Sequence, residues 1–157
     1  MSDGGEGRGA GSGQGRLLAI DLGDRRIGLA ISDPSGTIAS PAGFIDRRAG
    51  KRPPITALLA RATELGARGF VVGLPLDENG EDGDRCLEAR RLALELEKKT
   101  GLPTRMVDER FTTAAALRAV REMEGSTRGR RGDVDAMAAT LLLQHAMRMV
   151  ENADDAE

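Results

Sequence analysis

A chain of 157 residues with a net charge of −2 has the length of one compact domain that can bury a core without disulfide or metal cross-links. Its single cysteine, Cys86, excludes an internal disulfide framework and a cysteine-based zinc cluster, which favours a reducing compartment such as the cytoplasm. No segment approaches the ~20 apolar residues that cross a bilayer, so no membrane association is expected.

The N-terminal third of the chain predicts a disordered tail followed by strands. Residues 1–15 are rich in glycine and are expected not to pack. Apolar runs then predict strands at 17–21 and 27–32, and a weaker extended segment covers 37–45. Because the connections between these segments are short, they predict an antiparallel meander.

The rest of the chain alternates helices with strands. Strands are predicted at 69–74 and 104–108, and helices at 53–66, 84–99, 112–123 and 133–149, where Asp133 would cap the last. This order predicts an α/β fold with a mixed five-stranded sheet, three strands antiparallel and two parallel, and helices on both faces. The predicted domain covers 16–150, and 151–157 form an acidic tail.

Charge is unevenly distributed along the chain. Residues 151–157 contribute four negative charges and residues 1–15 a net single one, so the remaining body carries a net charge of +3. With no Trp or Tyr and only three Phe, the body lacks the aromatic side chains of a base-stacking platform. It does carry an arginine-rich stretch from 110 to 131, which could contact phosphates or, as composition alone favours, form a solvated surface.

Carboxylates stand at the chain positions that an open sheet brings to one edge. Asp21 ends the first strand, Asp108 and Glu109 end the last, and Asp135 lies in the predicted first turn of the final helix. Strand alternation sends Asp108 and Glu109 to opposite faces, so only one of them can join Asp21. Because clustered carboxylates repel one another, a divalent cation with oxygen preference is expected, Mg²⁺ or Mn²⁺, of the kind that hydrolyses phosphodiesters.

Each acid also has an ordinary structural explanation. Asp21 could pair with Arg25 or Arg26, the acids after the last strand could be surface charges, and Asp135 could interact with the positive end of its helix. The shared position of the acids at one sheet edge favours the metal site. The only histidine, His145, falls within the final apolar helix and is expected to pack there or to be partly exposed, not to act in catalysis.

Four spaced segments carry a recognisable pattern: DLGDRRIG at 21–28, VVGLPL at 71–76, VDERFTT at 107–113 and DAMAA at 135–139. In this order they resemble the YqgF family of RNase H-like proteins, described as nucleases of precursor 16S rRNA and related to Holliday-junction resolvases. The resemblance covers nearly all of 16–149. It implies an RNase H-like fold, which agrees with the fold predicted from the pattern of elements.

The resemblance also implies roles for individual residues. It makes Asp21, Glu109 and Asp135 the metal-binding and catalytic residues, holding Mg²⁺ or Mn²⁺. It places several arginines beside the nucleic acid, a role that suits the planar and permanently charged guanidinium. We predict six such arginines: Arg25, Arg26, Arg110, Arg128, Arg130 and Arg131.

The leading hypothesis for function is a cytoplasmic, metal-dependent nuclease that trims the 5′ end of precursor 16S rRNA in ribosome biogenesis. Its partners would be precursor rRNA and ribosomal particles, and it would act as a monomer or homodimer. The alternatives are resolution of branched DNA and a non-catalytic RNA-binding role in ribosome assembly. The DLG turn also resembles the phosphate-binding strand of actin-like and sugar-kinase ATPases, but those need two such domains.

Overall fold

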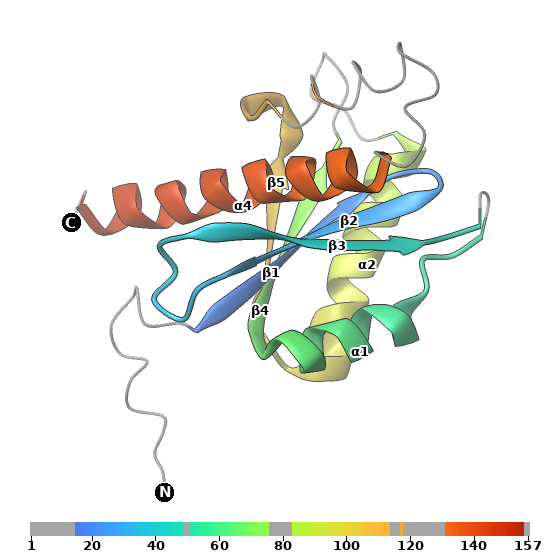
Figure 1. The fold of residues 1–157 in the computed structure, drawn as a ribbon, viewed down its shortest axis with the longest axis horizontal. Coiled ribbons are helices and arrows are strands. Elements are labelled where there is room, and N and C mark those ends of the chain that lie inside the picture. Colours follow the sequence, from blue (N-terminus) through green and yellow to red (C-terminus); the bar gives the residue numbers. More distant parts are fainter. Residues whose placement is uncertain (1–14, 49–50, 76–82, 114–116, 118–130, 156–157) are drawn as a thin grey trace, which may run out of the picture.

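The fold is built on one mixed sheet of five strands in the order β3-β2-β1-β4-β5 (Figure 1). The computed structural model describes residues 15–48, 51–75, 83–113, 117 and 131–155. Residues 1–14 of the predicted glycine-rich tail (1–15) and most of the predicted helix 112–123 therefore lie outside the described residues.

The first three strands form the predicted antiparallel meander. They are β1 (Arg16–Leu22), β2 (Arg26–Ser32) and β3 (Ala39–Asp46). The β1–β2 turn is closed by a hydrogen bond from the Gly23 amide to the Arg26 carbonyl, 3.0 Å long. In the resulting register Asp21 stands opposite Gly28, so the acid that ends the first apolar run has a glycine beside it.

Two further strands extend the sheet on the other side of β1, and both are parallel to it. They are β4 (Ala67–Leu74), which pairs with β1, and β5 (Thr104–Asp108), which pairs with β4. The predicted mixed sheet is therefore confirmed. Because β1, β4 and β5 run in the same direction, their carboxyl ends meet at one edge, as the sequence argument required.

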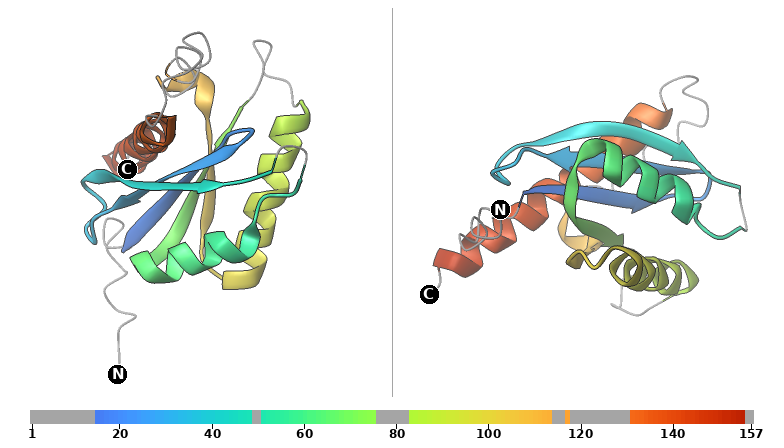
Figure 2. Two further views of the ribbon diagram at one scale, coloured as in Figure 1. Left: turned by 45° about the vertical axis from the view of Figure 1, so that its right-hand side comes forward. Right: turned by 90° about the horizontal axis from the view of Figure 1, so that it is seen from below.

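Helices cover both faces of the sheet (Figure 2). The helices α1 (Ile55–Leu65) and α2 (Asp84–Thr100) pack on one face, where their apolar sides meet the even-numbered residues of β1 such as Leu18 and Ile20. The helix α4 (Arg131–Asp155) packs on the opposite face against Ala19 and its neighbours. Alternation along the strands thus divides the core into two layers.

The last helix differs at both ends from its prediction. It begins at Arg131, so Asp133 lies inside it instead of capping it, and it continues to Asp155, beyond the predicted end near Met149. Asp135 consequently stands just past the first turn. His145 is half-buried in this helix, in agreement with its predicted packing role. Among the described residues, no helix is long and apolar enough to cross a membrane.

Candidate active site

Asp21 and Asp135 are both neighbours of Gly28. Asp21 shares its strand face with Ala19, which packs against α4, because residues two apart point to the same side of a sheet. Its cross-strand neighbour Gly28 touches α4 so closely that an added Cβ would stand 2.0 Å from the backbone oxygen of Asp135. This close approach of backbone to backbone brings the second acid down onto the face that carries the first.

Glu109 reaches the same face from the end of β5. It begins the short 3₁₀ helix η2 (Glu109–Phe111), where the chain leaves the strand. Its carboxylate lies over Gly73 of β4, since a Cβ added there would be 2.7 Å from Oε2 of Glu109 and 2.8 Å from Cδ1 of Leu142 on α4. The strand-end acids thus diverge as predicted: Glu109 lies beneath α4, and Asp108 turns to the neighbouring arginine.

All three acids are buried. Asp21 and Asp135 are each 1% exposed and Glu109 is 3% exposed, so Glu109 is not the surface charge of the alternative explanation. A buried carboxylate is costly unless a cation or hydrogen-bond donors accompany it. Asp135 has such a cation, because Nε of Arg26 lies 2.9 Å from its Oδ2. Arg26, predicted to face nucleic acid, therefore forms its ion pair inside the site.

The acids suit Mg²⁺ or Mn²⁺ by chemical type and by shared face. Carboxylate oxygens are the ligands that these hard cations prefer, and the absence of side chains at Gly28 and Gly73 lets Asp135 and Glu109 approach the sheet closely. Within the described part of the chain, however, no three His, Cys, Asp or Glu side chains are spaced to hold a metal ion together. The donors are assembled on one face, and they are not drawn in to coordination distance.

Two more of the arginines predicted to bind phosphates, Arg25 and Arg110, lie near this edge. Arg110 donates to both carboxylate oxygens of Asp108 through Nε and Nη2, at 2.7 to 3.1 Å. These hydrogen bonds hold the pKa of the Asp108 carboxyl below its usual value. Arg25 is exposed in the β1–β2 turn. Arg128 and Arg130 lie outside the described residues, and of Arg131 the structure describes the backbone alone.

The positioning roles of Gly28 and Gly73 were not predicted from the sequence. Gly28 and Gly73 both lie inside strands, where glycine normally weakens packing and therefore often marks a close approach of another group. That signal was available at each position. What the sequence could not give was the identity of the approaching group, which in one case is the backbone of Asp135 and in the other the side chain of Glu109.

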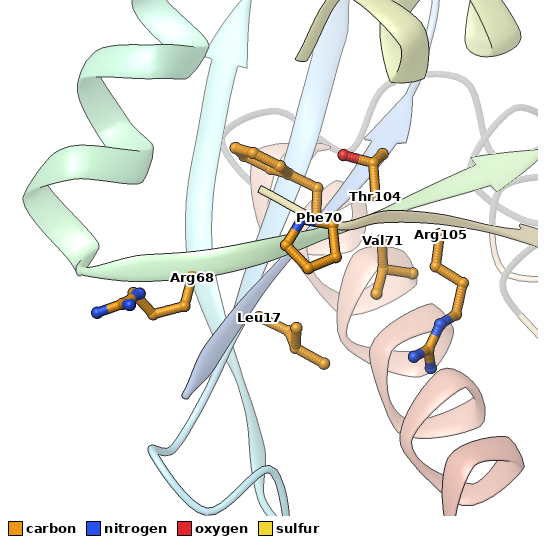
Figure 3. A pocket seen from close by; sticks show the side chains of 7 residues that line it. Leu17, Arg68, Phe70, Val71, Thr104 and Arg105 are labelled. Atoms are coloured by element: carbon orange, nitrogen blue, oxygen red, sulfur yellow. The ribbon is translucent and has the colours of Figure 1, made fainter. Parts of the chain in front are cut away.

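Two hollows of the surface lie away from the acids. One, of about 380 Å³, opens at the amino ends of the parallel strands, where Arg68 and Arg105 stand on either side of Leu17 and Val71 (Figure 3). A larger one, of about 870 Å³, lies between the start of α1 and α2, on the opposite face from α4. Neither includes Asp21 or Asp135 in its lining. Arginines therefore also stand at the amino ends of the parallel strands, away from the three acids.

Comparisons with known proteins agree on one family. A family model described as "RuvX: Holliday junction resolvase" matches residues 15–149. A protein of Koribacter versatilis named "Putative pre-16S rRNA nuclease" is 45% identical over 130 residues, which cover 83% of this chain and 84% of that relative. A protein of Clavibacter michiganensis with the same name is 39% identical over 133 residues, covering 85% and 83%.

A likeness to solved structures supports the fold. Thermus thermophilus RuvC in complex with a Holliday junction substrate superposes with a TM-score of 0.51 at 15% identity, covering 86% of this chain and 96% of that one. A second structure of the same RuvC gives a TM-score of 0.52. At this low identity the likeness concerns the arrangement of strands and helices, which is that of the predicted RNase H-like fold.

Proposed function

The chain belongs to the RuvX family, the family that its motifs resemble under the name YqgF, and we propose that it is a metal-dependent nuclease that hydrolyses phosphodiester bonds of precursor 16S rRNA. The observation that carries the proposal is the burial of Asp21, Glu109 and Asp135 on one face of the sheet, at the carboxyl edge of its parallel strands. Three charges are rarely buried together without a cation to share.

In this proposal Asp21, Glu109 and Asp135 hold Mg²⁺ or Mn²⁺, which when bound activates water and stabilises the charge on the leaving oxygen. The chain itself orients the acids. Gly28 and Gly73 set how deeply Asp135 and Glu109 sit, and α4 covers the site from above. Because a rigid carboxylate needs no rearrangement during the reaction, this positioning favours the hydrolytic step.

In the same proposal, the predicted arginines hold the substrate. Arg25, Arg110 and Arg131, with Arg128 and Arg130, would neutralise backbone phosphates on either side of the scissile bond. Such contacts position a nucleic acid without reading its sequence. The Asp108 carboxylate accepts three hydrogen bonds from the Arg110 guanidinium and keeps it oriented, so that Arg110 loses less conformational freedom when a phosphate binds. The reaction would take place in the cytoplasm, on free precursor rRNA or on ribosomal particles.

Resolution of branched DNA is the second candidate. It is favoured by the description of the matching family as a Holliday junction resolvase. Cutting a junction symmetrically requires two active sites, so this function needs a homodimer, whereas trimming an rRNA end needs one site only. The third candidate is a non-catalytic RNA-binding role in ribosome assembly. The three buried acids argue against this role, because RNA binding alone does not need them.

One experiment separates the three candidates. Purified protein is incubated with precursor 16S rRNA, single-stranded RNA of unrelated sequence and a four-way DNA junction, each with Mg²⁺, with Mn²⁺ and with a chelator. We expect metal-dependent cleavage of the precursor near its mature 5′ end. Paired cuts in the junction alone would favour resolution. Tight RNA binding with no cleavage under any metal condition would favour the non-catalytic role in ribosome assembly.

A further inference from the structure

The cation that the structure places against the acids is an arginine of the chain itself. Arg26 is the first residue of β2, and its Nε lies 2.9 Å from Oδ2 of Asp135 on α4. The Asp135 side chain is 1% exposed and the Arg26 side chain 16% exposed, so the pair is shielded from bulk water. Shielding strengthens the attraction between opposite charges and equally the repulsion between like charges.

We propose that Arg26 is the internal cation of the metal-free site, which neutralises Asp135 when no metal is bound and competes with a divalent metal for that carboxylate. The inference rests on the proposed function, because it takes Asp135 to be a metal ligand. It assigns Arg26 to the regulation of metal loading, which differs from the phosphate contact predicted for it from the sequence.

The position of Arg26 favours direct competition with the metal for the Asp135 carboxylate over an effect on the metal from a distance. Arg26 and Gly28 are two residues apart on β2, so both point to the α4 face, the face that carries Asp21 and Glu109. A dication bound by the acids would therefore stand near a guanidinium of the same sign. Because like charges repel at short range, Arg26 must move away from Asp135, or the metal must bind more weakly.

The ion pair also lowers the repulsion among the three carboxylates that share this face. The guanidinium of Arg26 compensates one of the three negative charges. When the Arg26 pair opens, the full repulsion among the acids returns and favours an incoming cation.

A purely structural role makes a different prediction. If Arg26 only clamps α4 to β2, its replacement lowers stability to the same extent with and without metal, and metal affinity stays the same or falls. If Arg26 competes with the metal, its replacement raises metal affinity, and saturating metal recovers the stability that the ion pair had contributed. Metal affinity and melting temperature together therefore separate the two roles.

The test compares three variants with the wild type by calorimetric titration of Mn²⁺ into metal-free protein. Arg26→Gln removes the charge, Arg26→Lys keeps it, and the control Arg85→Gln breaks the Arg85–Asp24 ion pair, which joins α2 to the β1–β2 turn without involving Asp135. We expect Arg26→Gln to bind Mn²⁺ about tenfold more tightly than the wild type, as the loss of one close repelling charge implies. Arg26→Lys and Arg85→Gln should stay close to the wild-type affinity. Unchanged or weaker Mn²⁺ binding by Arg26→Gln would overturn the inference.

A measurement on the wild type covers the case in which Arg26→Gln does not fold. The Nε–H resonance of Arg26 is followed by ¹⁵N NMR during titration with diamagnetic Mg²⁺. We expect it to shift and to exchange faster with water as the site saturates, because the hydrogen bond to Asp135 is released. A resonance that stays unchanged at saturation refutes the competition. Wild-type protein that neither binds metal nor cleaves would refute the proposed function as well, whereas metal binding and cleavage with an unaltered Arg26 would refute only this inference.

Discussion

Gly73 lies directly beneath the carboxylate of Glu109. A Cβ added to this glycine would stand 2.7 Å from Oε2 of Glu109 and 2.8 Å from Cδ1 of Leu142, which is closer than real Cβ contacts come. Both neighbours are the far ends of flexible side chains. The glycine therefore controls where the Glu109 carboxylate sits more than it controls whether the chain folds.

Replacing Gly73 by alanine should damage the site more than the fold. We expect Gly73→Ala to lower the free energy of unfolding by about 1 kcal/mol, since Glu109 and Leu142 can move aside. The displaced Glu109 should weaken Mn²⁺ binding and reduce metal-dependent cleavage strongly. Gly83→Ala is the matched control, because no atom of the described residues lies within 4 Å of its added Cβ. Wild-type cleavage by Gly73→Ala would contradict the placement of Glu109.

The same substitution at Gly28 should damage the fold more than it does at Gly73. Its added Cβ would stand 2.0 Å from the backbone oxygen of Asp135 and 2.4 Å from the carbonyl carbon, and a helix backbone cannot rotate aside. Gly28→Ala should therefore push α4 off the sheet and lower the free energy of unfolding by about 3 kcal/mol. Urea denaturation of both variants provides the measurement. A loss no larger than that of Gly73→Ala would show that α4 can shift without cost.

The sequence was sufficient for the sheet because short connections and apolar runs determine strand order locally. The meander formed by β1, β2 and β3, and the sharp helix ends at Gly66 and Gly101, with φ of 71° and 73°, depend on neighbouring residues only. The helix α4 begins at Arg131, two residues before the predicted start at Asp133. Asp133 has a side chain that commonly caps a helix, but here it lies within the first turn. A capping preference is a local signal, and here the helix extends past it.

The sequence predicts which edge of the sheet carries the site and that acidic residues form it. It does not predict which side chains form ion pairs there. Strand polarity brings Asp21 and Glu109 to one edge, which follows from sequence. The contact between Arg26 and Asp135 joins residues 109 positions apart. No local sequence pattern favours this ion pair over one between Arg26 and Asp21. Long-range partners depend on how closely α4 approaches β2, and that distance is set by Gly28.

Nucleic-acid binding should depend steeply on salt, and Arg110 should account for part of that dependence. Arg110→Ala should weaken binding and reduce the slope of log affinity against log salt concentration by about 0.7 to 0.9, the effect of one phosphate contact. Arg68→Ala is the control, since Arg68 is exposed at the opposite edge of the sheet. Fluorescence anisotropy with labelled RNA at several salt concentrations gives both slopes. An equal slope for Arg110→Ala and wild type would remove Arg110 from the phosphate-binding surface.

Asp33 should make the β2–β3 turn sensitive to strong acid only. Its Oδ1 accepts hydrogen bonds from the amides of Thr37 and Ile38, at 2.7 and 2.8 Å, and these bonds, the one from Ile38 foremost, hold the pKa of the Asp33 carboxyl well below its usual value. A lowered pKa in the folded state means that the carboxylate contributes stability in full above the unfolded value of about 3.9, and that this contribution is lost as pH falls toward the folded value.

NMR titration tests whether the pKa of the Asp33 carboxyl is lowered in the folded protein. The amide shifts of Thr37 and Ile38 should stay constant through pH 4 and change only in stronger acid. Asp33→Asn should remove that change, because an amide side chain does not titrate in this range. Amide shifts that follow an ordinary aspartate titration near pH 4 would show that the turn does not hold the charged carboxylate.

The strongest test of the site is Asp21→Asn, which keeps the shape of a buried side chain and removes its charge. If Asp21 holds metal, the variant should fold and should be as stable as wild type or more so without metal, because repulsion among the acids is relieved. In wild type, Mn²⁺ at 100 times its dissociation constant should raise stability by about 2.7 kcal/mol, and this gain should largely vanish in the variant together with cleavage. If Asp21 were instead a structural ion-pair partner, Asp21→Asn would cost stability and leave the metal response intact. Melting temperatures with and without Mn²⁺, measured beside nuclease activity, distinguish these outcomes, and undiminished cleavage by Asp21→Asn would exclude Asp21 from catalysis.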